Sequence, residues 1–96
     1  MGQHENVPRT VLTSAQIRAA RALIKWTAED LSRTSSVSLR TIRRAEIADN
    51  EMTLTQANSL AIRRALEDAG VEFIDENGGG AGVRLQSPSR AGPAKI

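Results

Sequence analysis

The pattern of apolar and polar positions predicts four helices, the first of them near residues 13–25. The apolar residues of this stretch recur at three- and four-residue spacing on one helical face: Ile17, Ala20 and Ile24. Thr13 and Gln16 have the spacing of a capping box, in which side chains and backbone amides at a helix start bond reciprocally. We therefore expect a helix from residue 13 or 14 to about residue 25, with Trp26 packing at its exit.

A second helix is predicted to start at Thr27 and to end at a serine-rich turn. Thr27 is a good N-cap, and the acidic residues that follow, Glu29 and Asp30, suit the positive end of the helix dipole. Leu31 precedes Val37 and the next apolar helix face across this short turn, a pattern typical of two helices that meet at a steep angle.

The third predicted helix, residues 38–47, has an apolar face and a cationic face. With Ile42 at the centre of the buried face, a step of about 100° per residue places Glu46 on the inward side one turn later. Ser38 is placed to cap the helix start. The outward side carries three cations and a threonine: Arg40, Arg43, Arg44 and Thr41. Two interpretations stay open, a ridge that meets phosphate and an ordinary surface helix whose arginines only solvate it.

The fourth predicted helix ends at Gly70, in the position of a left-handed C-cap. Thr53 and Gln56 have the capping spacing, so we expect the helix to start there. Its apolar face is predicted to be broad: Ala57, Ala61, Ile62, Ala65, Leu66 and Ala69.

Two short strand-like runs, residues 71–74 and 82–85, follow the last helix and flank a glycine-rich turn. An isolated hairpin is marginal in water, so it must lean on the fourth helix or pair with another chain. Its apolar residues are candidates for either contact: Val71, Phe73, Val83 and Leu85. The predicted organisation is an N-terminal tail (1–11), a helical domain (12–70), the hairpin (71–86) and a C-terminal tail (87–96).

The composition indicates one small domain without catalytic or metal-binding chemistry. The chain has 96 residues, 40% of them hydrophobic, with no cysteine and one histidine, His4. Without cysteine there is no disulfide framework, and a lone histidine is usually a surface residue rather than a metal ligand. The carboxylates are scattered without a paired acid and base, so we expect neither an enzyme nor a cofactor. We also find no signal peptide or membrane-spanning run and expect a soluble, cytoplasmic protein.

The net charge of +2 conceals two oppositely charged halves. Residues 9–47 carry eight Lys or Arg against three Asp or Glu, a net charge of +5. Residues 48–82 carry two against seven, a net charge of −5. This asymmetry indicates one face turned to a polyanion and another turned away from it.

From about Thr13 to Gly70 the chain resembles the lambda-repressor-like helix-turn-helix family, also called the Cro or Xre type. The resemblance rests on three motifs in the family's order and spacing: QIRAAR (16–21), WTAEDLS (26–32) and VSLRTIRRAE (37–46). It implies a mainly α, compact four-helix domain, here followed by a short C-terminal β-hairpin. The chain departs from the family at Ser36, where glycine is frequent, and at Ser35, where a buried aliphatic residue is common.

The resemblance implies a role for several residues of the second and third helices. Three occupy base-reading positions: Leu39, Arg40 and Arg44. It places Ser38 and Arg43 nearer the DNA backbone, and Thr27 and Ala28 near a phosphate at the start of the second helix. The charges and the helical pattern of this chain add three candidates for backbone contacts: Lys25, Arg33 and Thr41. The resemblance also implies a salt bridge between Arg21 and Glu46, and the helical pattern agrees, because each of these charges lies on an apolar stripe and needs a partner.

The resulting hypothesis is a transcriptional regulator, of the repressor or autoregulator kind, that binds double-stranded DNA in the cytoplasm, associated with the nucleoid. It would act as a homodimer on an inverted-repeat operator, with helix 38–47 in the major groove. The alternative is a protein-binding module of the same fold, an antitoxin, adaptor or antiactivator, that contacts a regulatory protein partner through the acidic half and the hairpin.

Overall fold

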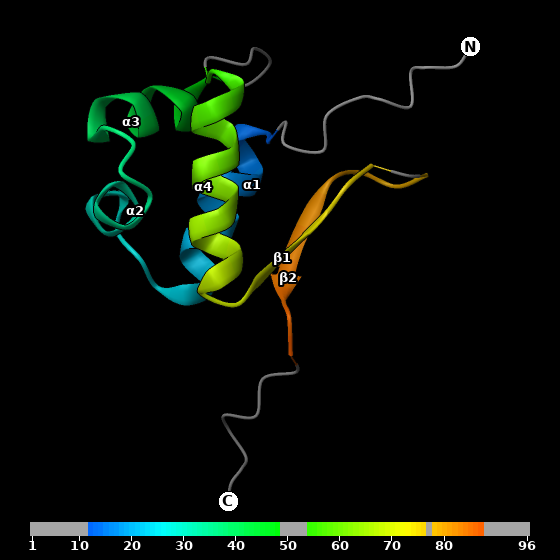
Figure 1. Ribbon diagram of the computed structural model, residues 1–96. Helices are drawn as coiled ribbons and strands as arrows, with labels where there is room; N and C mark the ends of the chain where they lie inside the picture. Colours follow the sequence, from blue (N-terminus) through cyan, green and yellow to red (C-terminus); the bar gives the residue numbers. More distant parts are fainter. Residues whose placement is uncertain (1–11, 49–53, 77, 88–96) are drawn as a thin grey trace, which may run out of the picture.

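The computed structural model describes residues 12–48, 54–76 and 78–87. This part of the chain forms four helices and one antiparallel hairpin (Figure 1): α1 (Ser14–Ile24), α2 (Ala28–Ser35), α3 (Leu39–Ile47), α4 (Gln56–Asp68), β1 (Val71–Ile74) and β2 (Gly82–Leu85). The prediction of a mainly helical chain with a C-terminal hairpin is confirmed. The predicted tails, 1–11 and most of 87–96, lie outside the described residues.

Each helix begins at a hydroxyl side chain that accepts a hydrogen bond from a backbone amide of the first turn. The N-caps are Thr13, Thr27, Ser38 and Thr55. Such a cap satisfies one of the amides that have no partner within the helix. The predicted capping box of α1 is confirmed, but the predicted start of α4 at Thr53 is wrong. The cap is Thr55, whose hydroxyl accepts from the amide of Asn58, and Thr53 lies outside the described residues.

The connections after α1, α2 and α4 turn through left-handed backbone conformations. Lys25, at the end of α1, has φ of 59°, and Ser36, at the end of α2, has φ of 66°. Gly70 follows α4 with φ of 109°, which confirms its predicted role, because glycine adopts this conformation without a Cβ clash. Ser36 therefore occupies the kind of position at which glycine is favoured.

All four helices and the hairpin contribute to one core. Its fully buried large side chains come from six segments of the chain: Leu12, Ile17, Leu31, Ile42, Ile62, Leu66 and Val71. Trp26 is half-buried and packs against this cluster, as predicted. The apolar face of α4 is narrower than predicted. Ala57 is exposed, because it lies about 140° round the helix from Ile62, and Ser59 is buried on the inward side.

The hairpin packs against its own chain. Its register pairs Val71 with Leu85 and Phe73 with Val83, so the four apolar side chains share one face. Val71 and Phe73 are buried among residues of the core, and the strands contact α1 and α4. Folding of the single chain therefore already covers the face that Val71 and Phe73 occupy, which is the packing within one chain that the sequence left open beside a dimer contact.

Two polar side chains fix the hairpin to the helices. Gln16 accepts from the Thr13 amide in the capping box of α1, and its amide nitrogen donates to the Gly82 carbonyl (3.0 Å) and, more weakly, to that of Ile74 (3.4 Å). On α4 the Arg63 guanidinium lies 5.2 Å from the centre of the Phe73 ring, within the range of a cation–π interaction. Neither link was predicted from the sequence, because both connect residues far apart in the chain.

Candidate nucleic-acid interface

α2 and α3 form the unit on which the predicted interface is built. In Figure 1 α2 is seen along its axis while α3 lies across the view, so the two helices cross steeply. The turn between them is held by two serines: Ser32 Oγ donates to the Val37 carbonyl (2.7 Å), and Ser35 Oγ accepts from the Val37 amide (3.1 Å). Ser35 is half-buried and bonds to the turn backbone where the resembled family usually places an aliphatic side chain.

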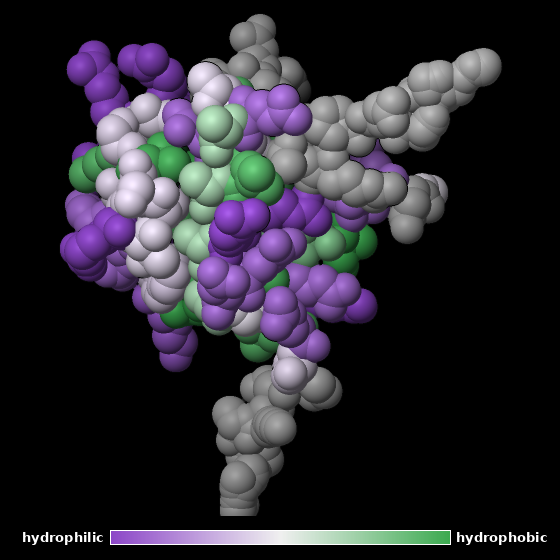
Figure 2. All heavy atoms as spheres, in the orientation of Figure 1, coloured by the Kyte–Doolittle hydropathy of each residue, from purple (hydrophilic) through white to green (hydrophobic). Residues whose placement is uncertain are grey.

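The two faces of α3 differ in burial as the sequence predicted. Ile42, Ala45 and Glu46 are buried, whereas the three arginines, Arg40, Arg43 and Arg44, are exposed. Leu39 and Thr41 are half-buried near the helix start, where Ser38 caps α3 and donates from its hydroxyl to that of Thr41 (2.8 Å). Figure 2 shows strongly hydrophilic side chains projecting at the edge of the molecule where α3 lies.

Sequence reasoning missed one member of the exposed face. Ile47, the last residue of α3, retains 78% of its surface exposed to solvent, the largest fraction among the large hydrophobic residues that the structure describes. It lies seven residues after Arg40 and three after Arg44, so it continues the same helical stripe. This spacing was visible in the sequence and extends the arginine ridge by one apolar side chain.

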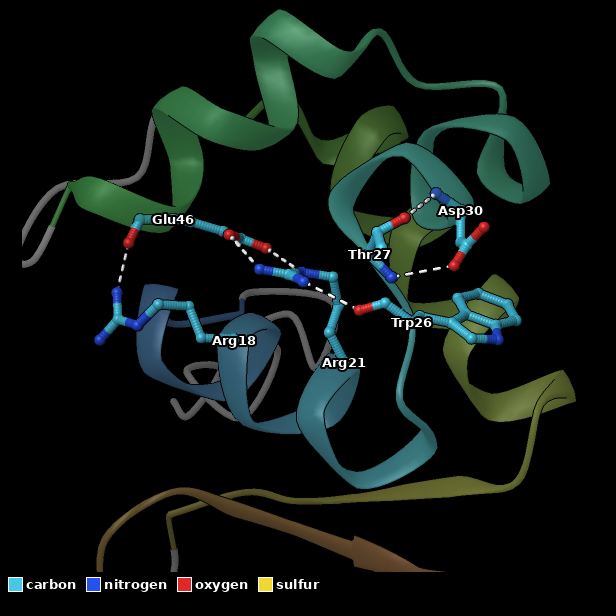
Figure 3. A network of polar contacts seen from close by, with 6 residues as sticks. All are labelled: Arg18, Arg21, Trp26, Thr27, Asp30 and Glu46. Atoms are coloured by element: carbon cyan, nitrogen blue, oxygen red, sulfur yellow. Dashed lines mark hydrogen bonds and ion pairs between the residues drawn. The ribbon is translucent and has the colours of Figure 1, made fainter.

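Arg21 on α1 and Glu46 on α3 form the predicted salt bridge, drawn in Figure 3. Two parallel hydrogen bonds, of 2.7 and 2.9 Å, join the guanidinium to the carboxylate. The hydrogen bond with Glu46 raises the pKa of Arg21 above its ordinary value. The remaining nitrogen of Arg21 donates to the Trp26 carbonyl (2.9 Å), and Arg18 donates to the Glu46 carbonyl. The end of α3 is thereby tied to α1 and to the connection before α2.

The N-terminus of α2 carries its own anion. The Thr27 amide donates to the Asp30 carboxylate (2.9 Å), and the Asp30 amide donates to the Thr27 hydroxyl (3.0 Å), which closes a second capping box (Figure 3). The hydrogen bond from the backbone amide of Thr27 holds the pKa of Asp30 below its ordinary value. A phosphate is predicted to approach Thr27 and Ala28. At this helix end the Asp30 carboxylate already accepts a hydrogen bond from one backbone amide, that of Thr27.

The carboxylates of α2 also hold two of the predicted phosphate-binding cations. Arg43 on α3 pairs with Glu29 on α2 (2.9 Å), and Arg33 pairs with Asp30 (2.7 Å). Other cations form no ion pair with any residue in the described part of the chain: Lys25, Arg40 and Arg44. The exposed surface of α2 and α3 thus combines two internally paired arginines with two, Arg40 and Arg44, that have no ion-pair partner within the ranges that the structure describes.

Within the described residues there is no group of three or more His, Cys, Asp or Glu side chains that could hold a metal ion. None of the described helices is long and apolar enough to cross a membrane. The exposed side of α3 presents the guanidinium groups of Arg40, Arg43 and Arg44, a kind of group that can pair with phosphate and with hydrogen-bond acceptors on base edges.

The chain as a whole matches no protein-family model. It also matches none of the curated proteins. The resemblance to the lambda-repressor-like helix-turn-helix family therefore rests on the motifs and helical pattern of this chain alone.

Proposed function

We propose that this protein is a non-enzymatic, sequence-specific regulator of transcription that binds double-stranded DNA through α3, with a lambda-repressor-like helix-turn-helix domain. The observation that carries the proposal is the division of α3 into two faces. One face is buried and fixed to α1 by the Arg21–Glu46 pair. The other presents Arg40 and Arg44 outward, without an ion-pair partner among the described residues.

The proposal assigns sequence recognition to the exposed side of α3. An α-helix fits the major groove of B-form DNA, where each base pair presents a distinct set of donors and acceptors. Arg40 and Arg44 would each make bidentate contacts to guanine, and Leu39, at the helix start, would touch a thymine methyl group. A rigid orientation of α3 supports this role, because base contacts require the side chains to be held in a fixed register.

Contacts to the DNA backbone would come from cations around this helix. Lys25, Arg33 and Arg43 are assigned to phosphates, which supply affinity and salt dependence but carry no sequence information. Ser38 and Thr41, at the start of α3, would contact the backbone from the side of the groove. Two copies related by a two-fold axis would place two α3 helices in successive major grooves, with half-sites about one turn apart, roughly 10 bp.

Selection of bound sites from a randomised duplex pool tests the proposal. Enrichment of a two-fold symmetric motif is the expected result. On that motif Arg40→Ala is expected to cost about 1–3 kcal/mol and to relax the preference at one base pair, whereas Arg43→Ala weakens all sequences alike. Failure to enrich any sequence, or equal loss for Arg40→Ala on the selected and a scrambled duplex, would refute the assignment.

A second candidate function is a protein-binding module of the same fold. The acidic side chains on the exposed part of α2 favour it, because Glu29 and Asp30 lie where DNA phosphates would pass. The salt dependence of binding to random duplex DNA separates the two functions. A steep fall in affinity between low and moderate salt is expected only if several phosphates are engaged.

A further inference from the structure

Glu29 on α2 forms an ion pair with Arg43 on α3, and the proposed function does not explain why an acidic side chain holds an arginine that is assigned to DNA. The pair joins α2 to α3 across the exposed surface, with 2.9 Å between Glu29 Oε2 and Arg43 Nη2. Both side chains lie largely in solvent, with 53% and 61% of their surfaces exposed, so the pair contributes little to stability. Its position is the informative part, because Arg43 lies beside Arg40 and Arg44 on the face assigned to DNA.

A carboxylate bound to a guanidinium occupies the place that a phosphate oxygen would take. Both anions accept hydrogen bonds from the planar guanidinium fork, and both carry negative charge. A phosphate that takes the same edge of the guanidinium, at Nη2, displaces Glu29, which then stands unpaired beside the phosphate. Asp30 holds Arg33 in the same way on α2, but it also caps the helix, so Glu29 is the residue whose role can be isolated.

We propose that Glu29 is an intramolecular competitor for DNA phosphate: it holds Arg43 in the DNA-free protein and lowers the affinity for duplex DNA of any sequence. This inference rests on the proposed function. By reducing the phosphate contribution, Glu29 lowers the occupancy of specific and nonspecific sites alike, and the base contacts of Arg40 and Arg44 still set the ratio between them.

The competition has a defined effect on the salt dependence of binding. Each phosphate that is neutralised releases condensed cations and adds about 0.9 to the slope of log affinity against log salt. While Arg43 stays paired with Glu29 it neutralises no phosphate, so the wild-type protein lacks the contribution of that contact. Removing the carboxylate charge restores it, which corresponds to about an eightfold higher affinity at 0.1 M salt for a slope change of 0.9.

The experiment compares Glu29→Gln with the wild-type protein on its selected site and on a scrambled duplex, over a series of salt concentrations. The expected result is a gain of about eightfold at 0.1 M salt on both duplexes, a steeper salt slope by about 0.9 and an unchanged ratio between the duplexes. In a protein that already carries Arg43→Gln, Glu29→Gln should raise the affinity for DNA less than twofold, because Glu29 then has no arginine at position 43 to pair with.

Glu72→Gln is the matched control. It makes the same charge change at an exposed carboxylate that also pairs with an arginine, Arg84, but on the hairpin (3.1 Å). Three results would overturn the inference. They are an equal gain in DNA affinity for Glu72→Gln, an equal gain for Glu29→Gln in the Arg43→Gln protein, and no gain in affinity for Glu29→Gln itself. Each of these results requires a wild-type protein that binds DNA, whereas a wild-type protein that selects no sequence contradicts the proposed function itself. Thermal unfolding of each variant confirms that the comparison is made on folded protein.

Discussion

The pair between Arg21 and Glu46 leads to an asymmetric prediction for its two single variants. The Glu46 side chain keeps only 9% of its surface exposed, whereas Arg21 keeps 22% and has a second acceptor, the Trp26 carbonyl. Arg21→Met therefore leaves a nearly buried carboxylate without a cation. Glu46→Leu leaves a guanidinium that reaches water and retains one hydrogen bond.

Removal of one partner of a buried ion pair costs about 3–5 kcal/mol, because the remaining charge is left uncompensated. We expect Arg21→Met to fall in this range. For Glu46→Leu we expect a smaller loss, about 1–3 kcal/mol, because the guanidinium remains partly solvated. Replacement of both residues removes both buried charges, so the double variant should be more stable than Arg21→Met, even though it carries one more substitution.

Urea unfolding of the four proteins at neutral pH, followed by circular dichroism, measures these differences in a double-mutant cycle. Equal losses for the two single variants would contradict the argument from unequal burial. Additive losses in the double variant would show that the pair has no coupling energy, and the role assigned to it in fixing α3 would then be wrong. DNA binding by the double variant gives a second test, since its α3 should be folded but less rigidly oriented and should lose sequence selectivity.

Three further changes test other features of the fold. Ser36→Gly should raise the free energy of unfolding by up to about 1 kcal/mol in urea titrations, because φ of 66° is strained for a residue with a Cβ, whereas Ser36→Ala should give no gain. Gln16→Glu keeps an acceptor for the capping box of α1 but replaces the donor that faces two hairpin carbonyls, so faster hydrogen exchange in β1 and β2 with little change in α1 is expected. Asp30 has a pKa below its ordinary value of 3.8, so its contribution to stability is present above that pH and is lost as the pH falls through the lowered pKa. Asp30→Asn should therefore weaken the dependence of unfolding on pH in this acidic range, and an unchanged dependence would contradict the assignment.

The sequence predicted the helices well because their signals are local. Each depends on residues three or four apart, such as the Thr13 and Gln16 capping box and the apolar stripe of α3. The wrong start predicted for α4 also follows from relying on local signals. Thr53 and Thr55 both have the chemistry of an N-cap, so the residue type alone did not distinguish them, and in the structure Thr55 is the cap.

Among the ion pairs between distant segments, the pair of Arg21 and Glu46 was expected, because the family resemblance implied it and because each charge stood on an apolar stripe. Glu46 inside an otherwise apolar face needed a partner, and Arg21 was the matching charge on α1. Glu29 and Arg43 are polar residues on polar faces, so nothing in the helical pattern of either one required the pair. Arg63 was missed because its position over Phe73 depends on how the hairpin folds back onto α4.

The contacts of α1 suggest how the hairpin and α3 are coupled under the proposed function. Gln16, at one end of α1, holds the hairpin, and Arg21, toward the other end, holds Glu46 of α3. One short helix thus sets the position of both elements through side chains on its own rigid backbone. In a dimer that used the outer edge of the hairpin, the same helix would set the distance between the two α3 helices. A change at Gln16 would then alter the preferred half-site spacing, although this residue belongs to α1 and lies outside the surface proposed to bind DNA.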